Sequence, residues 1–215
     1  MTDPLERLLQ HPSLWRAGGR SAVARTVLPT GFETLDRQLP GGGWPFPALI
    51  EFLMDRCGLG EIGLLVPALR ELQRRAGSER PGMLTWINPP YIPYAPGLAQ
   101  RGLELQRQIV TGPLTAVETL WTMEQALRSG ACAAVLAWAD VASTQSLRRL
   151  KLAAFEGGSL GVLFRSPRQR IQASPANLRL SLNVTGEQLQ IELVKVQGGA
   201  QQREVKLPRD LSEGS

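Results

Sequence analysis

The sequence predicts an α/β domain: a mainly parallel sheet flanked by helices, followed by a C-terminal antiparallel β meander. Three observations lead to this class. Between residues 48 and 164, strand-like segments alternate with segments that have the apolar periodicity of a helix. The strand-like segments are continuously apolar, as expected of parallel strands covered on both faces. From residue 177 onward, apolar and polar residues alternate, which is typical of antiparallel strands with one exposed face.

The first predicted strand and helix flank a glycine-bearing turn. ALIEFLM at 48–54 is expected to be a buried strand, and the turn DRCGLGEI leads into a helix that ends near Ala76. MLTWI at 83–87 is the next strand. The proline-rich segment PPYIPYAP that follows is expected to break regular structure.

A capping box marks the start of the next helix. Thr115 and Glu118 have the spacing of reciprocal side-chain caps, and the helix is expected to run to about Arg128. The side chains expected to face inward are Val117, Leu120, Trp121 and Leu127. A strand at 132–138, a helix from about 143 to 156 and a strand at 159–164 follow. This order favours a parallel sheet with right-handed crossovers.

The C-terminal part changes character and defines the domain limits. NLRLSLNV, QLQIELVKV and REVKL are predicted strands joined by turns at Thr185-Gly186 and Gly198-Gly199, after a polar loop at 166–177. We predict an N-terminal arm at 1–26, a single domain at 27–209 and a flexible tail at 210–215.

Length and composition bound the class of protein. The chain has 215 residues, of which 43% are hydrophobic and 20% charged, a mixture that suits one globular domain. No apolar run reaches the ~18 residues of a membrane-spanning helix. The N-terminal MTDPLERLLQ lacks the basic-then-apolar layout of a signal peptide. We therefore expect a cytoplasmic protein.

Cysteine and histidine are too few to predict a metal centre or an activated nucleophile. Cys57 and Cys132 lie in or beside apolar runs without a CxxC spacing, and His11 is the single histidine. This argues against zinc and against a histidine-activated nucleophile. We expect no metal, no cofactor and no catalytic residue.

The net charge of +5 has two possible explanations, and the sequence does not decide between them. The chain has 24 basic and 19 acidic residues, and nearly all of the basic ones are arginine. This balance fits nucleic acid or an acidic partner, and it equally fits a genome that favours arginine codons. Any DNA binding through such scattered charges would be weak and strongly salt-dependent.

The turn after the first strand has the context of a phosphate-binding loop, whose working pattern is G-x-x-x-x-G-K-[ST]. Gly60 keeps the second glycine, whereas Asp55 replaces the first one. Glu61 replaces the lysine and would repel a phosphate. Ile62 replaces the hydroxyl residue and offers no oxygen to Mg²⁺. Taken alone, the window is also compatible with an ordinary strand–turn–helix joint.

The surrounding residues resemble the RecA ATPase core. The order of residues before that family's phosphate loop is matched by Thr30, Gly31, Leu35, Asp36, Gly41, Gly42 and Glu51. The nucleotide-handling positions differ: Pro90 falls on the catalytic glutamate and Trp138 on the Walker B aspartate. Near the end, Lys195 matches one of two lysines and Gln197 replaces the other. The resemblance covers roughly residues 28–207 and implies a RecA-like core with a degenerate nucleotide site.

A RecA-like core with these losses resembles the ImuA family, the RecA-like accessory proteins of a bacterial damage-inducible mutagenesis cassette. LLQHPSLWRAGG resembles the arm of that family. The stretch from about 83 to 184 is also similar to SulA, the damage-induced inhibitor of FtsZ, but SulA lacks a counterpart of residues 28–54. The ImuA resemblance implies a role in SOS mutagenesis by translesion DNA synthesis. Its implied partners are the polymerase-like protein ImuB, RecA and the error-prone DNA polymerase of the cassette.

Two segments are candidates for binding partners. The arm carries an apolar set that either packs on its own domain or docks on a neighbour: Leu5, Leu8, Leu9, Leu14 and Trp15. The second segment matches a DNA-binding loop of RecA and contains Arg165, Arg168 and Arg170. Arginines can contact phosphates, but no aromatic residue interleaves them for base stacking. A solvated loop or a docking site for an acidic partner is the alternative.

The sequence leaves three candidate functions to weigh. The first is a non-catalytic adaptor of a translesion polymerase complex, which the RecA-like residues 28–54 favour. The second is a SulA-like cell division inhibitor that binds FtsZ. The third is a working ATPase or strand-exchange protein, which the degenerate loop disfavours. The sequence therefore favours a protein-binding module that is not an enzyme.

Overall fold

The computed structural model describes residues 26–77, 81–196, 203–209 and 211. It is organised around an eight-stranded sheet in the order β10-β9-β8-β3-β7-β6-β4-β5. The strands of this sheet are β3 (Ala48–Leu53), β4 (Met83–Ile87), β5 (Gln108–Thr111), β6 (Cys132–Trp138), β7 (Leu160–Arg165), β8 (Leu178–Thr185), β9 (Gln188–Val196) and β10 (Arg203–Pro208). A separate antiparallel pair is formed by β1 (Thr26–Leu28) and β2 (Trp44–Phe46).

The pairing of the strands confirms the predicted fold class. From β8 through β3, β7, β6 and β4 to β5, every neighbouring pair is parallel. The last three strands, β8, β9 and β10, pair antiparallel as a meander. β3 therefore lies inside the sheet with β7 and β8 as neighbours, and the loop that follows β3 leaves from the carboxyl edge of the parallel strands.

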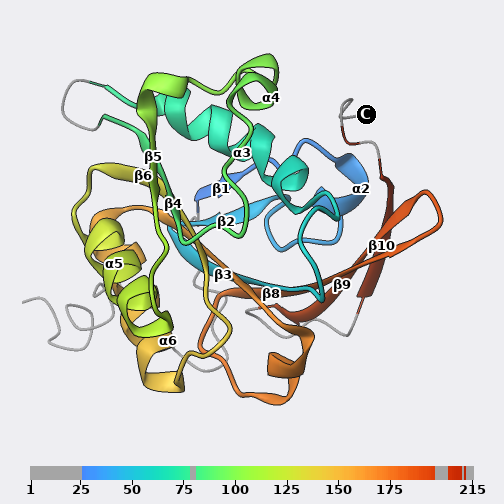
Figure 1. The fold of residues 1–215 in the computed structure, drawn as a ribbon. Helices are drawn as coiled ribbons and strands as arrows, with labels where there is room; N and C mark the ends of the chain where they lie inside the picture. The colour runs from blue at the N-terminus through green and yellow to red at the C-terminus, as the bar shows by residue number, and fades with distance from the viewer. Residues whose placement is uncertain (1–25, 78–80, 197–202, 210, 212–215) are drawn as a thin grey trace, which may run out of the picture.

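Helices cover both faces of the sheet (Figure 1). α3 (Glu61–Arg75) lies on one face, and its predicted apolar positions Leu64, Leu65 and Leu69 are buried there. α5 (Ala116–Arg128) and α6 (Thr144–Gly157) lie on the other face. The short elements are α2 (Glu33–Asp36), α4 (Ala95–Gln100) and the 3₁₀ turns η1 (Leu105–Arg107) and η2 (Pro167–Ile171).

The capping box of α5 is confirmed, but the expectation that Val117 and Trp121 face inward is wrong. The Thr115 hydroxyl accepts from the Glu118 amide at 3.3 Å, and the Glu118 carboxylate accepts from the Thr115 amide at 2.8 Å. Val117 and Trp121 are 79% and 59% exposed. The inward stripe runs through Met123 instead, and Trp121 lies about 200° away from it around the helix. Both side chains therefore face outward.

A buried carboxylate between two arginines joins the central strands. Glu51 lies in the middle of β3, and its side chain is fully buried. One carboxylate oxygen is 2.7 Å from Nη1 of Arg165 at the end of β7, and the other is 2.8 Å from Nε of Arg179 on β8. Since an ion in the interior needs a partner of opposite charge, Glu51 ties β3 to both of its neighbours.

The same two arginines hold the loop at 166–177 against the sheet. Arg165 donates to the carbonyl oxygen of Asp140 and to the side-chain oxygen of Gln172. Arg179 donates to the carbonyl oxygens of Gln169 and Gln172. Burial lowers the pKa of Arg179, while the Glu51 carboxylate acts against this shift. The segment predicted as a loop is thus held by hydrogen bonds from two buried arginines, and it contains the short η2 turn.

Replacing Glu51 by glutamine should strongly destabilise the domain. Glu51→Gln leaves the buried Arg165 and Arg179 without an anion, and breaking a buried pair in this way usually costs about 3–5 kcal/mol. Urea unfolding measures the effect. The matched control is Glu33→Gln, which removes the exposed pair with Arg37 and should change little. Equal stability of the two variants would contradict the role given to Glu51.

Candidate functional site

The turn between β3 and α3 keeps the shape of an anion-binding loop. Gly58 and Gly60 adopt φ values of 82° and 113°, which lie in the left-handed region that favours glycine. The turn brings the backbone N–H groups of Gly58, Leu59 and Gly60 together at the N-terminus of α3. Such converging N–H groups, with the helix dipole behind them, attract a negative charge.

The anion in this loop is the carboxylate of Glu61. One oxygen accepts from Gly58 N at 2.9 Å, and the other accepts from Leu59 N at 2.8 Å and Gly60 N at 3.1 Å. The Glu61 residue is only 3% exposed. A carboxylate at position 61 is expected to repel a phosphate. In the structure, Glu61 also uses the same N–H donors that a phosphate would need.

The other degenerate positions supply no nucleotide-binding group either. Asp55 is exposed, and Ile62 is half-buried against the core under α3. Trp138, which the RecA resemblance matches with the Walker B aspartate, presents an indole ring. Pro90, which the same resemblance matches with the catalytic glutamate, has no acidic group. The site therefore lacks the lysine, the hydroxyl and the carboxylates that handle Mg²⁺-ATP in a phosphate-binding loop.

A row of aromatic rings crosses the sheet beneath α3. Phe52 on β3 meets Phe164 on β7 with ring centroids 5.4 Å apart. Phe164 stacks on Trp138 of β6 at 4.5 Å, and Trp138 stacks on Trp86 of β4 at 6.3 Å. The indole N–H of Trp86 donates to the Gln108 side chain at 2.7 Å. This row forms an apolar floor on the face of the sheet that α3 covers.

A pocket of about 350 Å³ opens over Trp86 and Trp138. Its walls come from the loop at 57–58, from the first turns of α3 and from the proline-rich segment at 89–94, and α4 and Arg101 close it. Burial raises the pKa of the Cys57 thiol in this pocket. The Glu61 carboxylate raises it further, and the Trp138 indole acts in the opposite direction. The degenerate site is thus an apolar pocket.

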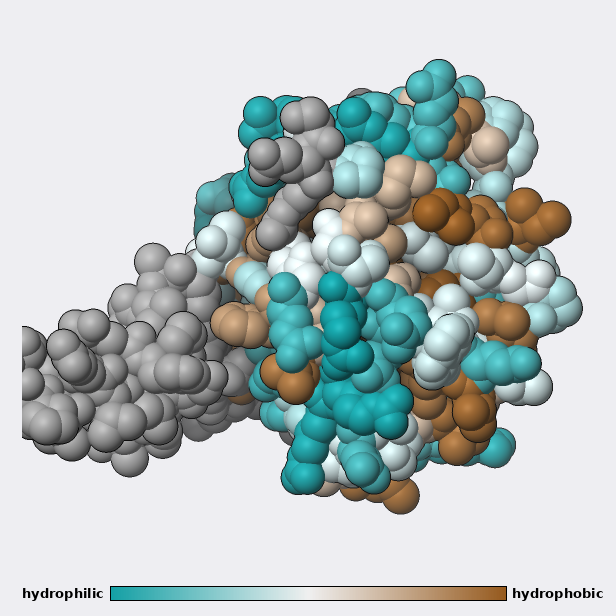
Figure 2. Space-filling model, turned by 90° about the vertical axis from the view of Figure 1, so that its left-hand side faces the viewer, coloured by the Kyte–Doolittle hydropathy of each residue, from teal (hydrophilic) through white to brown (hydrophobic). Residues whose placement is uncertain are grey.

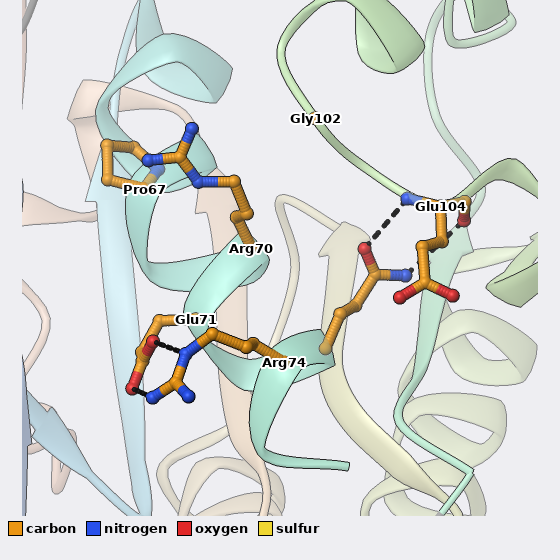
Figure 3. Close-up of a pocket in the computed structure, with 7 residues that line it drawn as sticks. Pro67, Arg70, Glu71, Arg74, Gly102 and Glu104 are labelled. Atoms are coloured by element: carbon orange, nitrogen blue, oxygen red, sulfur yellow. Dashed lines mark hydrogen bonds and ion pairs between the residues drawn. The ribbon is translucent and has the colours of Figure 1, made fainter.

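A second, polar pocket lies on the other side of the turn at 101–104 (Figure 3). In it, the Arg74 guanidinium pairs with Glu71 at 2.7 Å, while the side chain of Arg70 is drawn pointing towards Pro67 and also lies close to Gly102. The Gln73 amide bonds the backbone of Glu104 in both directions, at 3.0 and 3.3 Å. These contacts tie the turn to α3.

The residues matching the start of the RecA core have structural roles. Thr30 N donates to the Asp36 carboxylate at 3.0 Å, and Phe32 N donates to the Thr30 hydroxyl at 3.0 Å. Gly31 has a φ of 85°, and a Cβ there would lie 2.7 Å from the ring of Pro67 on α3. This turn therefore packs directly on the helix that follows the degenerate loop.

The three candidate arginines differ in availability. Arg165 is not in the exposed loop, because it ends β7 and its side chain is buried against Glu51. This corrects its assignment as a partner or DNA contact. Arg170 is paired with Glu192, which raises its pKa. Arg168 is exposed and forms no ion pair with a described residue. One of the three is thus left free to meet a phosphate or an acidic partner.

Two sets of sequence-based expectations fall outside the described residues. The arm residues Leu5, Leu8, Leu9, Leu14 and Trp15 are one set, and Gln197 is the other. In the part of the chain that the structure describes, no group of three or more His, Cys, Asp or Glu residues is placed to hold a metal. No helix there has the length and apolar character needed to cross a membrane.

Comparison with known proteins finds similarity to SulA and to ImuA. A family model described as "Cell division inhibitor SulA" matches residues 50–161, more than half of the chain. "Protein ImuA" of Caulobacter vibrioides (strain NA1000 / CB15N) is 32% identical over 141 residues, which are 64% of this chain and 56% of that protein. The chain thus spans little more than half the length of this ImuA relative.

Two further relatives are similar to parts of this chain. "Cell division inhibitor SulA" of Photorhabdus laumondii subsp. laumondii is 31% identical over 55% of this chain and 64% of its own length. "Protein RecA" of Prochlorococcus marinus (strain MIT 9303) is 28% identical over 59% of this chain and 32% of its own length. The resemblance to ImuA, with its relationship to SulA, is confirmed. Because the SulA model covers more than half of its residues, this chain belongs to the SulA family.

Proposed function

We propose that this chain is a non-catalytic, RecA-like accessory protein of the bacterial SOS mutagenesis complex, acting in the cytoplasm by binding other proteins. Its proposed partners are the polymerase-like protein ImuB, RecA, or both, together with the error-prone DNA polymerase of the complex. The similarity to ImuA supports this role. The observation that carries the proposal is the site itself, where the Glu61 carboxylate holds the loop's N–H groups and an apolar pocket replaces the nucleotide.

The chemistry of the site argues against an ATPase. A triphosphate would have to displace the Glu61 carboxylate from three N–H donors, and it would then meet no lysine. Mg²⁺ prefers oxygen ligands, and Ile62 and Trp138 offer none at the two positions where such ligands are needed. Apolar walls are suited to a protein side chain instead.

Inhibition of cell division through FtsZ is the second candidate function. The match of the SulA model to residues 50–161 and the similarity to a division inhibitor favour it. The RecA-like turn at Thr30 and Gly31 packs on α3 and lies before the region that the SulA model covers. This turn supports the ImuA-like function over the FtsZ-binding one.

Mg²⁺-ATP should not bind to this protein. Titration calorimetry of the full chain is expected to give no heat of binding, because the loop's donors are already used by Glu61. A nucleotide-binding RecA serves as the positive control. Glu61→Ala frees the three donors but restores neither the lysine nor the hydroxyl, so this variant should give no heat of Mg²⁺-ATP binding either. Binding by the natural chain at tens of micromolar would refute the proposal.

Removal of residues 1–20 should abolish capture of ImuB or RecA. The deleted segment contains the apolar residues Leu5, Leu8, Leu9, Leu14 and Trp15, whose burial at an interface can contribute about 1.5–3 kcal/mol per large side chain before ordering costs. Pull-down with purified partners measures binding, and a thermal melt of the truncated chain should be nearly unchanged. If the truncated chain unfolds, the arm belongs to its own core. Persistent binding by a folded truncated chain would place the contact elsewhere.

The same pull-down separates the two candidate functions. FtsZ is included as a third bait beside ImuB and RecA. Capture of ImuB or RecA without FtsZ supports the mutagenesis role. Capture of FtsZ alone, with inhibition of its polymerisation, supports the division-inhibitor role and refutes the first proposal.

A further inference from the structure

The pocket over Trp86 and Trp138 has features that suit one kind of ligand. We propose that it binds a protein segment that inserts one large apolar side chain and carries an acidic residue next to it. This inference rests on the proposed protein-binding function and names the surface and the chemistry of the partner.

The size and lining of the pocket fit an apolar anchor. Its volume of about 350 Å³ lies at the lower end of the range for pockets that bury small ligands or anchoring side chains. The floor is formed by the stacked rings of Trp86 and Trp138, and the walls include Ile62, Val66 and Leu98. Aromatic and aliphatic anchors in such desolvated pockets carry most of the binding energy of protein interfaces.

Few polar groups of the pocket are available to a ligand, which disfavours a polar small molecule. The Glu61 carboxylate accepts three backbone hydrogen bonds, and the Trp86 indole N–H is bonded to Gln108, whereas the buried indole N–H of Trp138 has no hydrogen-bond partner among the described residues. A small-molecule site normally has a few polar groups that converge on the ligand and orient it. Here the interior offers mainly shape and apolar contact, so most of the orientation of a ligand must come from outside the pocket.

Positive charges at the mouth supply that orientation. Arg101 lines the pocket, and Arg56 directly precedes the lining residue Cys57. These arginines are exposed and form no ion pair with a described residue, and Asp55 is the exposed acidic side chain on the same loop. Arginine favours carboxylate partners because its planar group can donate two parallel hydrogen bonds. The excess of positive charge therefore favours an acidic residue beside the apolar anchor.

Exposed apolar side chains around the pocket point to a protein, because they extend far beyond a small ligand. Tyr91, Ile92 and Tyr94 on the pocket's proline-rich wall are 77%, 88% and 73% exposed. Val117 and Trp121 are exposed as well, but they lie on α5, which covers the other face of the sheet. Figure 2 views the side that carries α5 and α6 in Figure 1 and shows that hydrophobic side chains are also exposed there.

Tyr91, Ile92 and Tyr94 lie at the carboxyl edge of the sheet. They follow the carboxyl end of β4, as the loop at 54–60 follows β3. In open α/β sheets, ligands bind outside these strand ends. Contiguous apolar surface framed by charge is also the usual mark of a protein interface. The partner surface is thus centred on the pocket and spreads along this edge.

Peptide selection tests the chemistry without assuming a partner. A random peptide library displayed on phage is selected on the full chain, and the enriched peptides are synthesised and their affinities measured by fluorescence anisotropy. The expected consensus is one Phe, Trp, Leu or Met with an Asp or Glu nearby. No enrichment, or a consensus without the acidic residue, would overturn the corresponding part of the proposal.

Paired variants locate the binding surface. Ile92→Asp and Tyr94→Ala alter exposed side chains of the pocket wall and should weaken the selected peptides at least about tenfold, the loss usual for an interface anchor. Arg101→Glu should weaken acidic peptides more than the same peptides with glutamine. The matched controls are Leu152→Asp and Arg148→Glu, exposed on α6 on the opposite face, which should bind as the natural chain does. Equal losses in both sets would refute the pocket as the site.

Alkylation of Cys57 provides a second test of binding that needs no substitution. This thiol lines the pocket and is partly accessible, whereas Cys132 is buried in the core and serves as an internal control. A bound peptide or partner protein should slow alkylation of Cys57 by N-ethylmaleimide several-fold, as followed by mass spectrometry. Alkylated protein should in turn lose peptide binding. Unchanged alkylation at saturating peptide would overturn the proposal.

The outcomes separate this inference from the proposed function. If ImuB or RecA is captured equally by the natural chain and by Ile92→Asp and Tyr94→Ala, with Cys57 unprotected, the pocket is refuted and the adaptor function stands. If peptides bind the pocket but neither protein is captured, the pocket stands and the named partners are refuted.

Discussion

The ion pairs between Glu51 and the two arginines Arg165 and Arg179 are the constraint on which the rest of this structure depends. They join β3 to β7 and β8 in the middle of the sheet, where all three side chains are buried. Through further hydrogen bonds, the arginines hold the loop at 166–177 in place. Because Glu51 lies two residues before the end of β3, the charge cluster anchors the strand directly ahead of the loop at 54–60.

At the carboxyl edge of the sheet, a carboxylate lies where a nucleotide site would hold phosphate, and an aromatic ring lies where such a site would hold a carboxylate. Where a nucleotide site would accept phosphate from outside, the Glu61 side chain supplies the anion from within. Where such a site would present a carboxylate, Trp138 stacks between Phe164 and Trp86. Both changes remove a need for bound ligand: the loop's donors are satisfied, and the floor is packed by its own rings. What remains is an apolar hollow with a basic rim.

Local patterns in the sequence were enough to predict most of the fold. Continuous apolar runs located β3, β4, β6 and β7, and the Thr115–Glu118 spacing located the start of α5. β5 was missed because four residues at the sheet edge leave too short a pattern. Contacts between distant segments escaped prediction too. The burial of Arg165 depends on Glu51, 114 positions earlier in the chain, and an arginine in a polar stretch gives no local sign of it. The hydrogen bonds of Glu61 are local, and a glutamate directly after a Gly-x-Gly turn is a signal that could have revealed them.

The carboxylate in the loop also bears on how such a protein can be controlled. A free ligand stabilises one state in proportion to its concentration, whereas a tethered group is always present at the same effective concentration. If the proposed absence of nucleotide binding holds, the shape of this loop does not depend on the concentration of phosphate compounds. A surface held in a constant shape binds its partners with a constant affinity, so its occupancy follows the amount of each protein. Control of such a surface would then rest on the synthesis and degradation of the proteins themselves.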